Sequence, residues 1–412
     1  MKRLLCLGLA VSLIAFSSVN SYAEAPKTAN NKAPQKAMQK EMQLRDTLFK
    51  NGLDSLKRLY NKKNIMISPL SIAEASAMLM NGAEGNTKKE LEGYLSNGEK
   101  LTKELSSYNN TPKKELKVAN SMWVGKSIKK EFLEQNKKMN AEAFDEVNAK
   151  KINEWVSKKT DKMIKEIVDS SVNGKPSVLV NALAFEAKWL NKYTEDYVKK
   201  SFTSIDGKKT QADFMEFYSD KIYLSSDKAE AFVKYYESTT DKASSVEDKS
   251  AFGILNNKNF KYLAILPKKG EDFDKYLKAL DEKEIETLLK SHEKYKGDKL
   301  VAIMPKYKSE YSTGLKEIFQ ANGVKDAFDK SMANFSKMSD SKGLYVSDII
   351  HKTFVEVDRE GTKAAAATAA IMEAMMEQVE PVVHTVTLDR PFIYIILDND
   401  NNPVFMGVQT SI

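Results

Sequence analysis

The chain has 412 residues, of which 64 are lysine or arginine and 57 are aspartate or glutamate, giving a formal net charge of +7. Basic and acidic residues are interleaved, which is typical of a solvated surface, and no basic stripe interleaved with aromatic residues predicts a nucleic-acid site. A single cysteine, Cys6, excludes an internal disulfide and a thiolate metal cluster.

The segment 1–23 has the layout of a secretory signal peptide. Two basic residues precede an apolar run, and Ser21 and Ala23 occupy the small-residue positions of a cleavage site. Because the run is too short to span a membrane, we expect a mature protein without a transmembrane segment, secreted or periplasmic, after cleavage near Ala23. Cleavage also removes Cys6, which leaves no thiol for catalysis or redox chemistry.

Residues 24–43 are polar, contain spaced prolines and have almost no large apolar side chains, so they predict a flexible linker. From Leu44 to the C-terminus, apolar periodicity never lapses for long. The length alone would suggest two domains. Because no internal repeat, low-complexity break or second linker marks a boundary, we predict one large domain over 44–412.

Helices are predicted early in the chain. Residues 42–60 have helical spacing of their apolar residues, and residues 152–168 are amphipathic. Residues 68–83 (SPLSIAEASAMLMNGA) predict an apolar helix that begins at a serine cap and ends at a glycine.

Strands are predicted mainly in the second half. The stretch SVLVNALAFEAKWL (177–190) carries apolar residues on both parities, so both faces would be buried, as in a central strand. Further strands are predicted at 259–267, 299–311, 345–358, 384–398 and 403–412. The predicted fold class is therefore α+β.

Motifs for catalysis are missing from the sequence, which has no H-E-x-x-H, no G-x-S-x-G, no P-loop and no G-x-G-x-x-G after a strand. Of the three histidines, His292 lies in a charged segment and is expected to be solvated, and His384 has no evident partner. His351 begins an apolar strand, where a buried structural histidine is more common than a catalytic base. The residues therefore predict neither an enzyme nor a cofactor.

Six segments resemble consecutive signature segments of the serpin family, in the family's order. They are 64–91 (NIMISPLSIAEASAMLMNGAEGNTKKEL), 152–168, 177–193, 303–328, 344–368 and 386–407. The resemblance implies a single serpin domain with three β-sheets, about eight to nine helices and an exposed reactive-centre loop at about 361–385. It also implies a protease inhibitor rather than an enzyme, and a monomer with the capacity to form loop-sheet polymers.

The segment GTKAAAATAA (361–370) follows a predicted strand and begins with a glycine, although its alanines would favour a helix. In inhibitory serpins this segment inserts as a new central strand of the main sheet once a protease has cut the loop. By resemblance, the hinge consists of Gly361, Thr362, Lys363, Ala364, Ala365, Ala366, Ala367 and Thr368. Alternation in a strand would turn the even-numbered residues inward and Lys363 outward. Small inward residues suit insertion, because an unpaired buried charge would cost several kcal/mol.

The resemblance also implies a polar cluster that gates the opening of the sheet. Its members are Ser68, Pro69, Ser71, Asn181, Trp189 and His351. Pro69 fixes the start of the helix, where its missing N–H has no cost, and Trp189 would lie where insertion begins. The alternative is that the polar members are ordinary buried groups, hydrogen-bonded because burial requires it.

Four positions depart from the family's pattern. Ala187 stands where glycine is common, and Asp389 stands where asparagine is common. Arg359 and Lys363 are basic where acids are frequent. None of these removes the small-residue hinge, but the reversed charges put a hinge salt bridge in doubt.

Family spacing from the hinge glycine places the reactive bond at Met375–Met376. No basic residue lies between Lys363 and Arg390, which disfavours a trypsin-like target, whereas Met375 suits the apolar pocket of elastase-, chymotrypsin- or subtilisin-like proteases. Neighbouring glutamates leave a glutamate-specific protease as an alternative. The predicted partner is a serine protease, with a cysteine protease as the second candidate. The alternative function is a non-inhibitory serpin that acts as a carrier, chaperone or structural protein.

The signal peptide gives a first test. N-terminal sequencing of the exported protein should begin at Glu24 or within a few residues of it. A mature protein that retains Met1 would contradict the predicted export.

Overall fold

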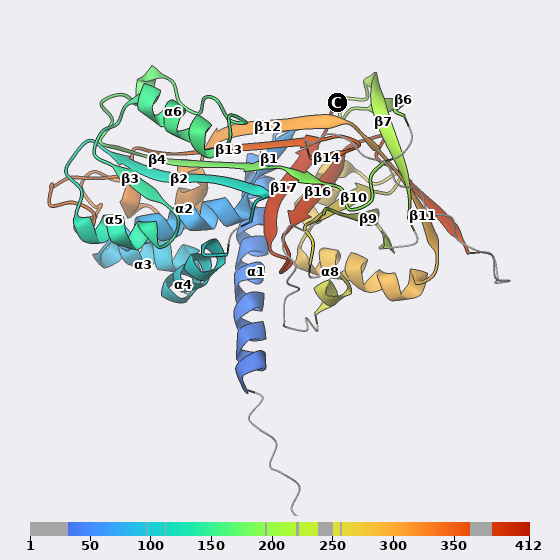
Figure 1. Cartoon of the computed structure of the whole chain (residues 1–412), viewed down its shortest axis with the longest axis horizontal. Coiled ribbons are helices and arrows are strands. Elements are labelled where there is room, and N and C mark those ends of the chain that lie inside the picture. Colours follow the sequence, from blue (N-terminus) through green and yellow to red (C-terminus); the bar gives the residue numbers. More distant parts are fainter. Residues whose placement is uncertain are drawn as a thin grey trace, which may run out of the picture.

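The computed structural model describes residues 32–96, 98–111, 113–193, 196–219, 222–237, 250–255, 258–362 and 381–412. Within these ranges the chain forms nine α-helices and three β-sheets, together with a two-stranded ribbon (Figure 1). The predicted α+β class, with three sheets and about eight to nine helices, is confirmed.

The helices are α1 (Lys32–Leu59), α2 (Pro69–Gly82), α3 (Gly85–Tyr94), α4 (Gly98–Asn109), α5 (Lys130–Lys137), α6 (Ala149–Lys159), α7 (Phe273–Ala279), α8 (Glu282–Lys290) and α9 (Lys316–Ala321). Short 3₁₀ helices lie between these elements: η1 (Ser170–Val172), η2 (Ala251–Ile254), η3 (Ser291–Tyr295) and η4 (Asp326–Phe328). In the residues that the structure covers, no helix is long and apolar enough to cross a membrane.

The five-stranded sheet has the order β12 (Tyr307–Gly314), β13 (Asp348–Val357), β4 (Ser177–Phe185), β2 (Leu116–Val124) and β3 (Glu142–Phe144). The six-stranded sheet has the order β1 (Ile65–Ile67), β17 (Pro403–Gln409), β16 (Phe392–Leu397), β10 (Lys261–Pro267), β9 (Ala229–Tyr235) and β8 (Tyr223–Ser225). The four-stranded sheet contains β15 (Val383–Thr387), β11 (Lys299–Pro305), β7 (Lys209–Ser219) and β6 (Val198–Thr203). The ribbon pairs β14 (Gly361–Thr362) with β5 (Ala187–Lys188).

Both faces of β4 are buried, as its sequence predicts. Its odd-numbered residues, such as Leu179 and Leu183, join the large core, in which α2 packs against both β4 and β17. Its even-numbered residues, such as Val180 and Ala182, join a smaller core with Ile152 of α6. The five-stranded sheet is therefore covered by α6 on one face and by α2 on the other (Figure 1).

The strands β4 and β13 form a parallel pair at the centre of the five-stranded sheet. Their register runs from Val178 opposite Asp348 to Phe185 opposite Val355. The pairings on either side of them, β4 with β2 and β13 with β12, are antiparallel. A strand that reversed direction after β13 would be antiparallel to both β4 and β13, so the parallel pair leaves one place in the sheet for such a strand.

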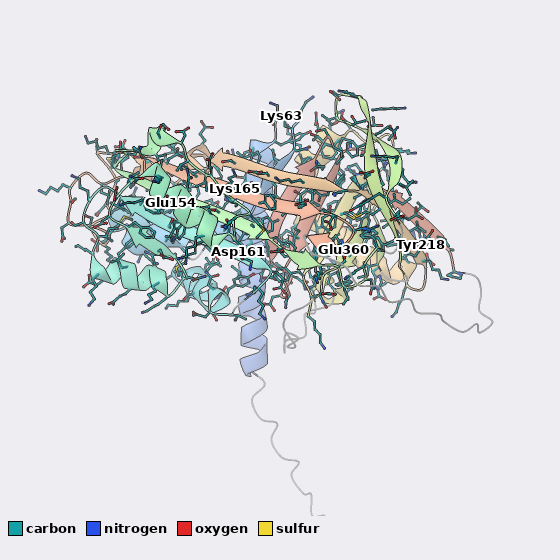
Figure 2. All side chains as sticks on the ribbon, turned by 45° about the horizontal axis from the view of Figure 1, so that its top comes forward. Lys63, Glu154, Asp161, Lys165, Tyr218 and Glu360 are labelled. Carbon is teal, nitrogen blue, oxygen red and sulfur yellow. The ribbon has the colours of Figure 1, made fainter. Side chains whose placement is uncertain are left out.

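Two predicted boundaries differ from the structure. The helix α6 ends at Lys159 and does not continue to 168, because Asp161 and Lys162 adopt φ angles of 48° and 65° (Asp161 is labelled in Figure 2). Left-handed backbone of this kind interrupts a right-handed helix. The helix α1 begins at Lys32, inside the segment predicted as a flexible linker, since alanine, glutamine, lysine and methionine extend a helix that the core already holds.

Candidate functional site

The hinge begins with a tight turn at the end of β13. Asp358 N donates to Gly361 O at 3.0 Å, and the Asp358 carboxylate accepts the amides of Glu360 and Gly361 at 2.9 and 3.2 Å (Glu360 is labelled in Figure 2). The chain therefore reverses direction within four residues of leaving the sheet.

After the turn, the hinge is already paired on the extension of β4. Gly361 lies opposite Lys188 and Thr362 opposite Ala187, in the antiparallel ribbon of β14 and β5. Gly361 has a φ of +141°, and a Cβ built on it would lie 2.3 Å from Ala187 O. Both the positive φ, which glycine adopts readily, and the close packing against β5 therefore require a glycine here.

Trp189 lies beside this turn. Its indole is fully buried and stacks on Tyr236 with the ring centroids 4.2 Å apart. Its Nε1 donates to Asp358 O at 2.8 Å, and its backbone N donates to Glu360 O at 3.1 Å. The structure therefore places Trp189 at the hinge, where the sequence analysis expected insertion to begin.

The four predicted polar residues of the gate meet between α2 and the central strands, all fully buried. Ser68 caps α2 by accepting the Ser71 amide at 3.1 Å, and Pro69 is the first residue of the helix. Ser68 N donates to His351 Nε2 at 3.1 Å. Because a backbone amide can only donate, Nε2 must accept, so the ring proton lies on Nδ1 and is donated to Asn181 Oδ1.

Asn181 connects this chain of hydrogen bonds to β2. Its Nδ2 donates to Ser71 O at 2.7 Å and to Asn120 Oδ1 at 2.6 Å. Asn120 Nδ2 in turn donates to Glu74 Oε2 at 2.5 Å. From Ser68 to Glu74, every donor points towards the carboxyl group, and hydrogen bonds aligned in this way strengthen one another.

Asn120 and Glu74 are not among the residues that the sequence predicts for this cluster. One signal was present for Glu74, which is the only ionisable residue in the apolar helix segment 68–83. Asn120 sits inside β2, a strand that the sequence analysis did not predict. Its partners lie 46 and 61 residues away along the chain, so their meeting depends on the pairing of β2 with β4.

Burial sets the charge state of this cluster. Desolvation lowers the pKa of His351 to about 3, so the imidazole is neutral near pH 7. Desolvation raises the pKa of Glu74 to about 7, although hydrogen bonds from Asn109 and Asn120 and the charge of Lys113 act in the opposite direction. A neutral His351 matches the structural role that its place in an apolar strand predicts.

Ion pairs do form near the hinge, despite the basic residue at 359. Arg359 pairs with Asp196 at 2.9 Å, and Glu360 pairs with Lys192 at 3.6 Å. The Asp196 side chain is 97% exposed, so its pair with Arg359 contributes little to stability. The pair between Lys192 and Glu360 is the more buried of the two.

Several predicted residues lie outside the described part of the chain. They are Lys363, Ala364, Ala365, Ala366, Ala367, Thr368, Met375 and Met376. At the far end of the predicted loop, β15 begins at Val383, which pairs with Lys299 of β11.

Two histidines differ from the sequence-based expectation. His384 has a partner, because its Nε2 lies 2.7 Å from Asp298 Oδ2 and its ring stacks on Tyr223 with the centroids 3.9 Å apart. His292 is half-buried in η3 rather than fully solvated. Neither the contacts of His384 nor the partial burial of His292 can be predicted from the sequence, because both depend on residues brought together from separate strands and turns.

Comparison with known proteins gives consistent results. The family model described as "Serpin (serine protease inhibitor)" matches residues 47–411. A serpin-like protein of Thermococcus kodakarensis is 30% identical over 84% of this chain and 80% of its own length. The human leukocyte elastase inhibitor is also 30% identical, over 84% of this chain and 92% of its own length. The crystal structure of tengpin, a thermophilic serpin in its native state, has 31% identity and a TM-score of 0.75, covering 94% of this chain and 96% of that one.

Removal of the His351 ring tests the gate. His351→Ala leaves the Ser68 amide and Asn181 Oδ1 without their buried partner, a loss of about 1–3 kcal/mol. We expect a lower melting temperature and polymers on mild heating, measured by calorimetry and native electrophoresis. His292→Ala is the matched control, because His292 lies in η3 away from the central strands. If the two variants are equally heat-stable and monomeric, His351 does not hold the sheet closed.

Proposed function

This chain belongs to the serpin family, and we propose that it is a suicide-substrate inhibitor of a serine protease with apolar specificity. The observation that carries the proposal is the position of the hinge. Its first two residues already pair with the extension of β4 at the end of the parallel seam between β4 and β13.

A single register supports insertion of the loop at this seam. Gly361 pairs with Lys188 on one side and forms a bridge with Asp358 on the other. Lys188 and Asp358 are 170 positions apart, which is also the offset between Asn181 and His351 in the parallel pair. Continuing this pairing for seven positions sets Thr368 opposite both Asn181 and His351. Insertion would therefore replace the hydrogen bond between these two side chains.

The same register decides which hinge residues turn inward. Residues opposite one another in neighbouring strands share a face, and the side chain of Asn181 points to α2. Thr368 and the other even-numbered hinge residues would therefore face α2 and the large core, whereas Lys363 would face the side covered by α6. The inward positions hold only alanine and threonine, which enter the core without desolvating a charge.

Insertion has a large driving force. A new strand of about fourteen residues, at about 0.5–1.5 kcal/mol for each hydrogen bond, contributes on the order of 10 kcal/mol. This is comparable to the whole stability of a typical domain, about 5–15 kcal/mol. The intact protein would therefore be kinetically trapped, and the gate would set the rate of opening.

Inhibition requires loop insertion to be faster than hydrolysis of the acyl-enzyme ester. The protease serine attacks the carbonyl carbon of Met375 and expels the Met376 amine, which leaves an acyl-enzyme ester. Insertion from Gly361 onward then carries the acylated protease across the molecule and distorts its oxyanion hole and triad, so deacylation stalls. A relative named for its inhibition of leukocyte elastase supports an apolar residue at the reactive bond.

A charge at the first inward position should convert the inhibitor into a substrate. Thr362→Arg forces a buried charge at the start of insertion, so cleavage at Met375–Met376 should continue while the protease is released. Electrophoresis under denaturing conditions should show cut protein and no covalent complex. Lys363→Arg, with the same side chain on the outward parity, is the matched control and should still trap. Equal trapping by both variants would mean that the parity assignment is wrong.

The residue before the reactive bond should select the target. Met375→Arg should keep the trapping reaction but transfer it from elastase-, chymotrypsin- or subtilisin-like proteases to trypsin-like ones, as measured by second-order inhibition rates. If the parent forms no denaturant-resistant complex with any of these classes, and its cut form melts at the same temperature as the intact form, the protein is a non-inhibitory serpin with a carrier, chaperone or structural role.

A further inference from the structure

The polar cluster connects two groups of elements that must separate when the sheet opens. The strand β13 is tied to β1 and α2, because Thr353 Oγ1 donates to Met66 O at 2.8 Å and Ser68 N donates to His351. The strands β2 and β4 form the other group, since they pair over nine residues. The helix α2 contacts β2 and β4, but it also packs against α1 and β17, outside the five-stranded sheet. If α2 stays with that core, opening of the seam between β4 and β13 moves β2 and β4 together relative to α2.

Every hydrogen bond of the cluster that crosses between the two groups ends on one of two asparagines. Asn181 of β4 bonds to His351 and Ser71, and Asn120 of β2 bonds to Ser71 and Glu74. Separation of the groups therefore also takes Asn120 away from the Glu74 carboxyl group and opens the site to water. Among the described residues, Glu74 supplies the one carboxyl group of this hydrogen-bonded cluster, and the residue is 1% exposed.

We propose that Glu74 is a positioning residue that couples the opening of the sheet to its own ionisation, so that loop insertion is faster above neutral pH than below it. This inference rests on the proposed function, because it concerns the rate of the same insertion step.

The direction of the effect follows from where the carboxyl group is hydrated. In the closed sheet, burial raises the pKa of Glu74 from 4.5 to about 7, so at alkaline pH the closed state holds an ionised, poorly solvated carboxylate. In the open sheet, water solvates the carboxylate and its pKa returns towards the ordinary value. Deprotonation therefore favours the open state as the pH rises through 7, whereas protonation below that range stabilises the closed state.

Three other titratable groups lie around Glu74: His351, Lys113 and Tyr108. His351 stays neutral, because burial lowers its pKa to about 3. Lys113, in the segment between α4 and β2, lies over the Tyr108 ring with its Nζ 3.4 Å from the centroid. Burial lowers the pKa of Lys113, but the charges of Asp398, Asp400, Glu74 and Glu115 oppose that shift. Burial raises the pKa of Tyr108, so the phenol is neutral in this range.

Asp400 is a second carboxyl group whose pKa is raised towards neutrality. Burial and the charge of Asp398 raise its pKa to about 6. It lies in the turn between β16 and β17, outside the hydrogen-bonded cluster, so its variant tests whether the pH effect arises there instead.

The test measures the opening of the sheet without a protease. A synthetic peptide of residues 361–374, capped at both ends so that its termini do not titrate, is annealed to the intact protein between pH 5.5 and 8.5. Incorporation is followed by native electrophoresis and by the rise in melting temperature. The parent should incorporate the peptide about tenfold faster at pH 8.5 than at pH 5.5, with a midpoint near 7.

Glu74→Gln keeps an acceptor for Asn120 but cannot ionise, so its rate should be the same at both pH values. The ratio of rates within one variant cancels any change in its overall stability. Two controls should keep the parent's ratio: Asp400→Asn, and Glu282→Gln on α8, whose carboxyl pKa burial also raises to about 7. A parent rate that does not depend on pH, or an unchanged dependence in Glu74→Gln, would overturn the inference and leave the proposed function intact. Failure of the peptide to insert at any pH would contradict the insertion step itself, and with it the proposed function.

Discussion

The parallel pairing of β4 with β13 is the contact on which the rest of the arrangement depends. Its backbone hydrogen bonds hold the centre of the five-stranded sheet, and the side-chain bond between His351 and Asn181 spans it on the face that α2 covers. Antiparallel strands flank the pair on both sides, so a strand that reverses after β13 fits there without a change in direction of any neighbour. The intact sheet is thus complete as it stands and still has one place for another strand.

In the proposed mechanism, insertion would need little reorganisation of the hinge at its first step. The turn from Asp358 to Gly361 reverses the chain, and the ribbon of β14 and β5 sets the register before any protease acts. Trp189 holds the carbonyls of Asp358 and Glu360, so the start of the movable segment is fixed to the extension of β4. The polar cluster, the proposed gate, lies further along the same seam. Initiation and resistance to opening are therefore separated in space, and substitutions should alter them independently.

Much of this arrangement could be predicted from the sequence, because periodicity identifies α2 and β4 and the family's motifs identify Ser68, Ser71, Asn181 and His351. The contribution of Asn120 and Glu74 could not, since their contact requires two elements 46 residues apart to be placed within hydrogen-bonding distance. The end of α6 could not be predicted either, because residues 160–168 keep an amphipathic pattern and the interruption comes from the left-handed backbone of Asp161 and Lys162. The contact of His384 with Asp298 has the same origin in tertiary packing.

A reversible lock across the seam tests the central claim most directly. Ala182 and Lys352 lie opposite each other on the face away from α2, and the mature protein is predicted to contain no other cysteine. The double variant Ala182→Cys, Lys352→Cys should form a disulfide, because paired strands place these residues within its reach. The melting temperature is measured before and after one cut in the loop. The cut protein should gain stability only after reduction with dithiothreitol. An equal gain with the disulfide intact would contradict insertion between β4 and β13.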